Sequence, residues 1–288
     1  MINKKLINEI DIDLDYYRKS NSDLQLLSED QLLNHYIQYG KAEGRSNQMS
    51  RRDFLLSIPR NKTLEIGPFT NPSIIGKNVK YFDVLDFPAL VQRAKKHSYP
   101  ITHNINIDYV SSDGDLSIIG EKFDSIFSSH CIEHQIDLIK HINDVGKILT
   151  SDGKYYLIIP DKRYCFDYFL PESSVADVLG ASLLKSNGLH HPSNILKNRV
   201  MTTHNDPVKH WSGEHGDIES KMLLKVSNAL SEISNNKGYI DVHAWQFTPE
   251  SFKQILDILL SISIVNLKIN YISNTPFNSN EFCVVLSK

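Results

Sequence analysis

Thr63-Leu-Glu-Ile-Gly-Pro-Phe-Thr-Asn-Pro72 is the stretch from which the fold can be inferred. Its apolar residues predict a strand that ends in Glu65 and Gly67 and then breaks into a turn rich in Pro and Asn. One carboxylate and one glycine therefore stand at the carboxyl end of a strand. In an α/β sheet of parallel strands, this is the end that binds nucleotide-like ligands.

Two further apolar runs repeat this arrangement. Residues 79–86 end in Asp83 and Asp86, at the spacing where the next strand of a doubly wound sheet offers an acid to a ribose diol. Residues 123–130 lead into a turn that contains Glu133 and a second histidine. An acid, an acid and a histidine-rich turn at three strand ends predict an adenosine-containing cofactor beside a reacting group.

The order of predicted strands and helices gives the fold class. Strands at 63–67, 79–84, 123–128 and 154–159 alternate with helices at 87–97 and 135–149, while 101–108 is a strand or a turn. Such alternation predicts an α/β fold with a doubly wound, mainly parallel, Rossmann-like sheet. Two closing strands, at 264–271 and 281–287, predict an antiparallel hairpin.

The sequence pattern divides the chain into a small module, a linker and a large domain. Residues 1–46 are expected to form a small helical module, because Ser28 opens a capping box and glycines follow the last apolar group. Residues 47–60 form a polar linker, and 61–288 form the α/β domain. Within that domain the regular pattern is lost at about 161–245, which is rich in His, Asn and Ser and predicts an elaborated cover over the site.

Composition excludes some classes of function. The formal net charge is −3, so no strong positive field favours a nucleic-acid partner. The three cysteines form no Cys-x-x-Cys pair, and no signal-peptide core or membrane-spanning window is found. We therefore expect a cytoplasmic protein with no transmembrane segment and, at most, a peripheral contact with a membrane-bound glycan-assembly complex.

Three motifs carry a resemblance to a known family. They are Leu64-Glu-Ile-Gly-Pro68, the Phe123–His134 run and Ile159-Pro-Asp-Lys-Arg-Tyr164. Together they resemble class I S-adenosylmethionine-dependent methyltransferases, in particular the type 11-like branch, over roughly residues 61–260. The first 46 residues resemble a small module attached to enzymes of bacterial surface-polysaccharide synthesis.

The resemblance implies roles for the cofactor, S-adenosyl-L-methionine, and its product S-adenosylhomocysteine. Glu65 and Gly67 would lie at the methionine end, and Asp83 would accept hydrogen bonds from the ribose, with Asp86 as the alternative. Asp113-Gly114 would face the adenine, although a plain Asp-Gly turn explains this pair nearly as well. The loop departs from the family in having one glycine, which leaves its path open.

Histidines supply the candidate catalytic groups. The resemblance places His130 beside the sulfonium, and His134 is either structural or a base. His210 and His215 belong to a histidine-rich stretch in which one neutral imidazole would take the acceptor's proton. No spacing fixes a metal site, and none is assigned.

The same residues also match the H-x-x-E-H pattern of a zinc hydrolase, through His130, Glu133 and His134. That motif needs both histidines on one helical face, whereas His130 ends a strand-like run. The zinc hydrolase is kept as an alternative function.

The function expected from the sequence is an O-methyltransferase acting on a sugar or glycan-linked hydroxyl in bacterial surface-polysaccharide synthesis. The expected partner is a glycan, nucleotide-sugar or lipid-linked sugar acceptor; the alternative is a methyltransferase of a small metabolite. The sugar is suggested by the polar cover around Trp211 and Trp245 and by the module. Lys162 and Arg163 could receive an anionic group of the acceptor.

Overall fold

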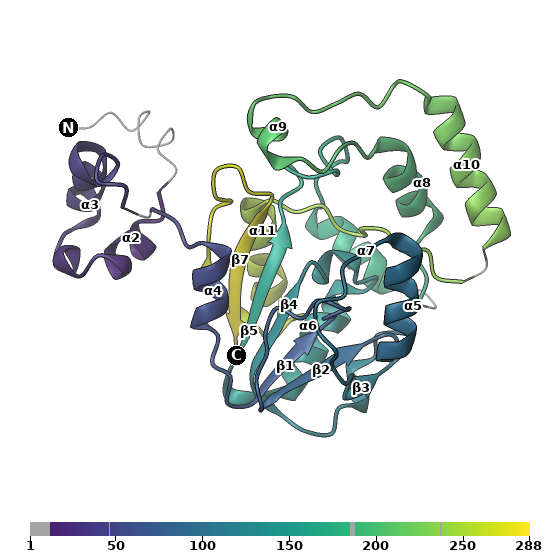
Figure 1. Cartoon of the computed structure of the whole chain (residues 1–288), viewed down its shortest axis with the longest axis horizontal. Helices are drawn as coiled ribbons and strands as arrows, with labels where there is room; N and C mark the ends of the chain where they lie inside the picture. Colours follow the sequence, from purple (N-terminus) through teal and green to yellow (C-terminus); the bar gives the residue numbers. More distant parts are fainter. Residues whose placement is uncertain (1–11, 46, 185–187, 237) are drawn as a thin grey trace.

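A seven-stranded sheet forms the centre of the chain in a computed structural model that describes residues 12–45, 47–184, 188–236 and 238–288 (Figure 1). The strands are β1 (Thr63–Ile66), β2 (Val79–Asp83), β3 (Tyr109–Val110), β4 (Phe123–Ser129), β5 (Leu149–Pro160), β6 (Lys268–Ile272) and β7 (Glu281–Ser287). Their order is β3-β2-β1-β4-β5-β7-β6. The first five run parallel, and β7 lies antiparallel between β5 and β6. The predicted fold class, a doubly wound sheet with closing antiparallel strands, is confirmed.

Ten α-helices in the described part of the chain surround this sheet. They are α2 (Leu14–Ser20), α3 (Glu29–His35), α4 (Arg51–Ser57), α5 (Phe87–His97), α6 (Leu138–Ile148), α7 (Val175–Leu184), α8 (Pro192–Met201), α9 (Pro207–Trp211), α10 (Met222–Asn235) and α11 (Pro249–Ser261). Apolar residues of α6, α7 and α11 share one buried cluster with the sheet, and those of α4 and α5 share a second. The two clusters are the two layers expected when helices wrap a parallel sheet.

Capping residues explain where these helices begin. Asp86 caps α5, Asp137 caps α6 and Thr248 caps α11, each by accepting a hydrogen bond from a backbone amide of the first turn. Proline follows the cap in α5 and in α11, where its missing N–H is not needed.

Some boundaries differ from the sequence prediction. Helix α6 begins at Leu138 rather than 135, because Asp137 is its cap. Strand β5 begins at Leu149, directly after α6, and β6 begins at Lys268 rather than 264. The region 101–108 contains no strand, and the short β3 follows it.

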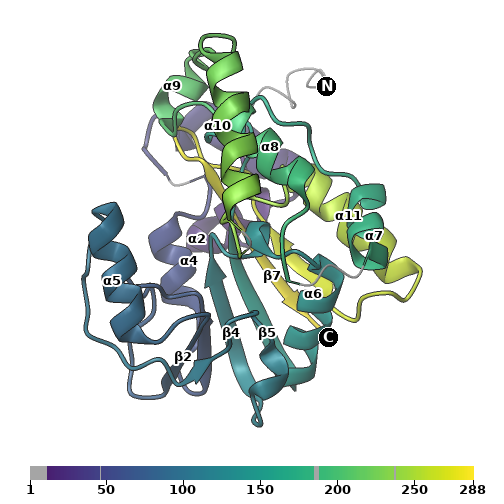
Figure 2. The ribbon, with the colours of Figure 1, turned by 90° about the vertical axis from the view of Figure 1, so that its right-hand side faces the viewer.

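The segment 161–245 contains α7, α8, α9 and α10, and α8, α9 and α10 lie beyond the carboxyl ends of the parallel strands (Figures 1 and 2). Its position agrees with a cover over the site. Among the described residues, no helix has the length and apolar character needed to cross a bilayer.

The first helices stand beside the sheet and have a small cluster of their own, built on Tyr17, Leu24 and Leu32 (Figure 1). The segment predicted as a linker is not merely a connector, because it forms α4. Phe54 of that helix is 1% exposed and packs in the sheet's second cluster.

Candidate functional site at the carboxyl edge of the sheet

The loop after β1 is held from within by Glu65. Its Oε1 accepts a hydrogen bond from the amide of Ser73 at 2.8 Å, and its Oε2 accepts one from the amide of Ile74 at 3.0 Å. Burial raises the pKa of Glu65 to about 7, although both hydrogen bonds favour the charged form. Both carboxylate oxygens therefore hold the loop, and the predicted position of Glu65 at the methionine end of the cofactor stays a prediction.

Gly67 has the backbone conformation that this loop requires. Its φ is 71°, in the left-handed region that glycine tolerates best. A Cβ at this position would lie 3.4 Å from Sγ of Cys131, so the loop also passes close to the end of β4. Phe69, with φ of 50°, takes the left-handed conformation without being glycine.

Asp83 ends β2 and faces the same loop. Its Oδ2 accepts a hydrogen bond from the amide of Phe69 at 3.2 Å, and its Oδ1 accepts one from the amide of Val84 at 2.7 Å. Burial raises the pKa of Asp83 despite these bonds. Each oxygen keeps a second lone pair, so the carboxylate can still accept two hydroxyl groups. Asp86 is instead the cap of α5, which argues against its role as the alternative ribose acid.

Asp113 and Gly114 form a turn beside the end of β2. Oδ1 of Asp113 accepts a hydrogen bond from the hydroxyl of Ser111 at 2.5 Å, and Gly114 has φ of 73°. That hydrogen bond lowers the pKa of Asp113, whose side chain is exposed. The amide of Ser111 donates to the backbone oxygen of Asp83 at 3.2 Å, so the turn lies next to the proposed ribose acid.

His130 follows β4 and joins three elements. Its Nε2 lies 2.8 Å from Oε2 of Glu281 on β7, and the same oxygen accepts a hydrogen bond from Arg51 of α4 at 2.7 Å. Burial opposes protonation of His130, but Glu281 and the charge of Glu133 raise its pKa. The backbone of His130 has φ of 48°, a strained conformation of the kind found at functional sites.

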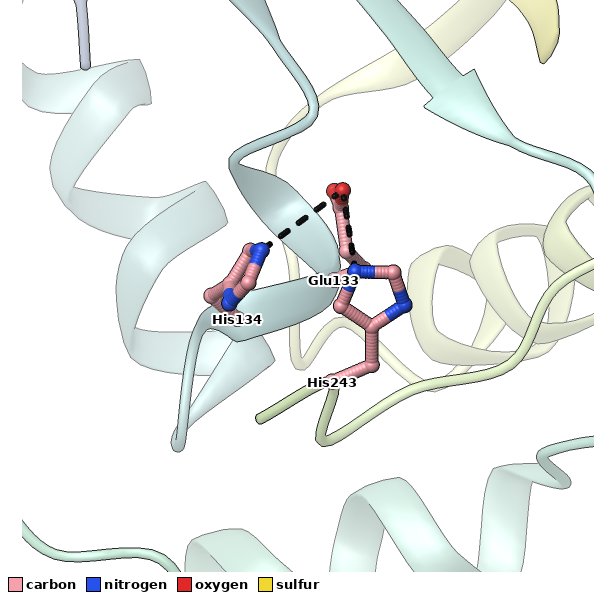
Figure 3. A group of neighbouring side chains, drawn as sticks. All are labelled: Glu133, His134 and His243. Atoms are coloured by element: carbon pink, nitrogen blue, oxygen red, sulfur yellow. Dashed lines mark ion pairs between the residues drawn. The ribbon is translucent and has the colours of Figure 1, made fainter. Parts of the chain in front are cut away.

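A second group of side chains surrounds Glu133, on the 3₁₀ turn η4 (Ile132–His134). The carboxylate is fully buried, and neither oxygen has a hydrogen-bond partner. Oε1 lies 3.9 Å from Nε2 of His134 and 3.8 Å from Nε2 of His243, and both rings point toward it (Figure 3). Nδ1 of His130 lies 3.7 Å from the same oxygen.

Two outer carboxylates orient these rings. Nδ1 of His243 lies 2.6 Å from Oδ2 of the buried Asp167, and Nδ1 of His134 lies 3.0 Å from Oδ1 of Asp241. Burial opposes the charged form of His134, but Asp241 and Glu133 raise its pKa. A neutral imidazole whose Nδ1 faces a carboxylate carries its proton there, so its Nε2 keeps a lone pair.

His243 is brought to η4 by backbone hydrogen bonds. The amides of Ala244 and Trp245 both donate to the backbone oxygen of Glu133, at 2.7 and 3.1 Å. This contact spans about a hundred residues, which explains why no local pattern in the sequence identified it.

His210 and His215 form a separate cluster in the cover. Their Nδ1 atoms lie 3.0 Å apart, and Nε2 of His210 lies 3.1 Å from the backbone oxygen of His204. The ring of His215 stacks on Tyr168 at 3.6 Å. His210 is buried, and burial lowers its pKa. Both nitrogens of His210 thus have partners within the cover.

The cations predicted to receive an anion have partners within the chain. Arg163 forms an ion pair with the buried Asp161 at 2.7 Å, and Lys162 donates to the backbone oxygen of Tyr168 at 3.0 Å. Trp245, predicted as part of a polar cover, is 3% exposed and lies in the main core instead.

The H-x-x-E-H pattern does not form the helical face that a zinc hydrolase of that type needs. Glu133 and His134 lie on one 3₁₀ turn, whereas His130 precedes the turn with a left-handed backbone. The residues that sequence reasoning missed are the partners at a distance: Arg51, Glu281, Asp167 and Asp241. For His243, the sequence offered one indication, the large number of histidines in residues 190–243.

No protein-family model matches the sequence, and no curated protein matches it either. Solved structures with a similar chain path include an S-adenosylmethionine-dependent methyltransferase from Clostridium acetobutylicum, at 11% identity, with 90% of this chain and 98% of that chain covered and a TM-score of 0.41. A putative methyltransferase of the same kind from Listeria monocytogenes shows 12% identity, 82% and 96% coverage, and a TM-score of 0.39. A putative zinc-dependent alcohol dehydrogenase from Rhodobacter sphaeroides shows 15% identity, 83% and 90% coverage, and a TM-score of 0.44. At these values the fold assignment rests on the sheet order and register of the chain itself.

Proposed function

We propose that this chain is an S-adenosylmethionine-dependent methyltransferase that acts on a hydroxyl group. The observation that carries the proposal is the carboxyl edge of the sheet. There the left-handed Gly67, the buried acid Asp83 and the histidines after β4 come from three neighbouring parallel strands. Ligands of doubly wound sheets bind at this edge.

The chain's residues fit the cofactor. Asp83 has lone pairs left for the two ribose hydroxyls, and Gly67 leaves room because it carries no Cβ between the loop and Cys131. Asp113, exposed beside Asp83, would meet the adenine. When bound, the cofactor supplies a methyl group on a positively charged sulfur.

Methyl transfer joins the acceptor oxygen to the methyl carbon, breaks the carbon–sulfur bond and releases the hydroxyl proton. We assign acceptance of that proton to Nδ1 of His130. Its Nε2 faces Glu281, which Arg51 holds in place, so the ring is oriented as the base of a triad is oriented by its third member. Among the three rings near Glu133, the side chain of His130 is the most exposed, at 38%.

For the acceptor, we propose a sugar joined to a lipid. The polar groups around the site suit a sugar hydroxyl, whereas the cover also exposes large apolar side chains, such as Leu183 at 81% and Leu223 at 88%. A cavity of about 280 Å³, lined mainly by apolar residues, lies by α8 and α10. Equal turnover of a nucleotide sugar and a lipid-linked sugar would remove the lipid part of this proposal. The alternative acceptor is a small metabolite. A screen of methyl acceptors distinguishes it from a lipid-linked sugar.

The test is a calorimetric titration with S-adenosylhomocysteine. The unchanged chain should bind it, and Asp83→Asn should bind at least about ten times more weakly, since each lost charged hydrogen bond is worth roughly 1.5–3 kcal/mol. The matched control is Asp86→Asn, an acid three positions away that caps α5 and should keep the affinity. His130→Gln should keep the affinity and lose turnover about 100-fold or more. Equal affinity in the two Asp variants would contradict the cofactor assignment.

A further inference from the structure

The group around Glu133 has a property that methyl transfer does not require. A fully buried carboxylate with no hydrogen-bond donor is unfavourable by several kcal/mol, unless a positive charge compensates it. Three imidazole nitrogens lie 3.7 to 3.9 Å from Oε1 of Glu133: Nδ1 of His130 and the Nε2 atoms of His134 and His243. Only the last two belong, with Glu133, to a group whose ligand atoms are all close to one another.

The carboxylates of Asp167 and Asp241 determine which ring nitrogen of His243 and His134 carries the proton. Nδ1 of His243 forms a hydrogen bond of 2.6 Å with Asp167, which places the imidazole proton of His243 on Nδ1. Nδ1 of His134 lies 3.0 Å from the carboxylate of Asp241, which favours the same tautomer without forming a hydrogen bond. Each Nε2 then presents a lone pair to a carboxylate oxygen. Three electron-rich atoms that face one another repel, so this arrangement is stable only around a cation.

The separations distinguish a metal ion from an added proton. A charged N–H to carboxylate hydrogen bond closes to about 2.7–2.9 Å, whereas the two Nε2 atoms stand 3.8 and 3.9 Å from Oε1 of Glu133. Bonds of about 2.0–2.1 Å at tetrahedral angles place neighbouring ligand atoms about 3.4 Å apart. Each Nε2 atom would need to approach Oε1 of Glu133 by about half an ångström to reach this separation.

Two imidazoles and one carboxylate form a ligand set that suits first-row transition metals and leaves a coordination position open. The contact of each ring's other nitrogen with a carboxylate is the outer shell typical of metal-bound histidine. His134 is 27% exposed on its side chain, so the group is accessible from one side. Of the described residues, Glu133, His134 and His243 are the set whose ligand atoms all lie within 4.8 Å of one another.

We propose that Glu133, His134 and His243 bind one divalent transition-metal ion, for which zinc is the probe. Asp167 and Asp241 are positioning residues for the two rings. The binding claim stands apart from methyl transfer. Its role in catalysis rests on the proposed function: the open position would take the acceptor's oxygen and make its hydroxyl more acidic.

The test is a zinc titration against a chromophoric chelator, with the protein first stripped of metal. One zinc ion should bind per chain. Asp167→Asn should weaken binding by about 10–100-fold, as the loss of an outer-shell partner does, and Glu133→Gln and His243→Ala should weaken it further. The controls are His97→Ala and His103→Ala, two exposed histidines elsewhere, which should keep the affinity. Equal affinity in all five variants would overturn the proposal, since surface histidines would then account for the binding.

A second measurement needs no variant and so does not depend on whether Glu133→Gln folds. Cobalt(II) added to the stripped chain should give visible absorption of a four- or five-coordinate site with nitrogen and oxygen ligands, and zinc should displace it. A spectrum of six-coordinate aqueous cobalt would overturn the site. S-adenosylhomocysteine binding is measured on the same sample. Metal binding without cofactor binding would keep the metal site and remove its catalytic role. Cofactor binding without metal binding would overturn the metal site and leave the proposed function standing.

Discussion

The carboxylate of Glu65 illustrates how a single residue can hold the loop beside a candidate site. It is 2% exposed at the end of β1, and both oxygens accept amides of the loop that follows. The two hydrogen bonds stabilise the charged carboxylate of Glu65, whereas its burial away from water destabilises the charge. The balance of these two effects depends on pH.

We expect part of the protein's stability to fall as pH rises from about 4.5 to about 7. In this window the folded chain keeps the proton on Glu65 that the unfolded chain has already released, so the free energy of unfolding decreases with pH. One pKa unit corresponds to about 1.4 kcal/mol, so the loss is about 3 kcal/mol at most. Glu65→Gln removes the titration.

Urea denaturation of the unchanged chain and Glu65→Gln, each at pH 5 and pH 8, measures this loss. The variant is expected to be less stable at pH 5, because its amide meets a backbone N–H, and the gap should narrow by pH 8. A gap that stays constant between the two pH values would contradict the assigned pKa.

Sequence reasoning placed Glu65 and Asp83 at the right strand ends but could not say what each carboxylate bonds. It could not decide between Asp83 and Asp86 either, because both follow the same apolar run. The structure shows Asp86 capping a helix and Asp83 facing the loop after β1. His243 belongs to the histidine-rich set, but its contact with Glu133 was not predicted because the two residues are far apart in the chain.

Among the elements, helix α5 ends in an unusual residue. Ser98, after its last turn, has φ of 57°, the left-handed conformation that glycine normally supplies at this position. The residue is exposed, and its backbone amide points to the carbonyl of Ala94 or Lys95. The helix therefore ends at His97, and the residue that caps it, Ser98, has a strained backbone conformation.

Ser98→Gly should raise the free energy of unfolding by about 1 kcal/mol, because glycine has no Cβ to clash in the left-handed region. Chemical denaturation measures the change. Ser98→Ala is the matched control, and since alanine keeps the Cβ its stability should stay close to that of the unchanged chain. An equal gain in both variants would point to the hydroxyl and not to the backbone.

Helix predictions differed in accuracy. The helix at 87–97 was predicted with the bounds of α5, which Asp86 caps and Pro88 follows in the first turn, whereas the start of α6 was predicted three residues too early, before its cap Asp137. Strand β5 starts eleven residues before Pro160, because pairing with Phe123 extends it across a polar, glycine-bearing stretch. Tertiary pairing of this kind leaves no local pattern.

For the whole molecule, hydrogen bonds join the described part of the first helices to the sheet and to α4. Tyr271 donates to Asp13 at 2.8 Å, and Tyr16 donates to Asp53 at 3.2 Å. Helix α4 differs, since Phe54 and Ile58 are buried against the sheet, at 1% and 2% exposed. The boundary of the folded core should therefore lie before α4.

A chain that begins at residue 47 should fold and unfold cooperatively, whereas a chain that begins at residue 61 should not. Loss of one buried phenylalanine alone costs about 3–5 kcal/mol, a large share of the stability of a typical domain. Thermal denaturation followed by circular dichroism compares the two. Cooperative unfolding of the shorter chain would show that α4 is dispensable, and its absence in the longer one would make the first helices part of the core.

Glu281 opens the last strand of the chain, yet β7 lies inside the sheet, between β5 and β6. Its carboxylate is also what Arg51 and His130 share. In the strand order, β6 reaches the rest of the sheet only through β7, so the two antiparallel strands join the parallel strands together, by pairing of β7 with β5. Because Glu281 stands 151 residues after His130, the ring of His130 is oriented only once that pairing has formed.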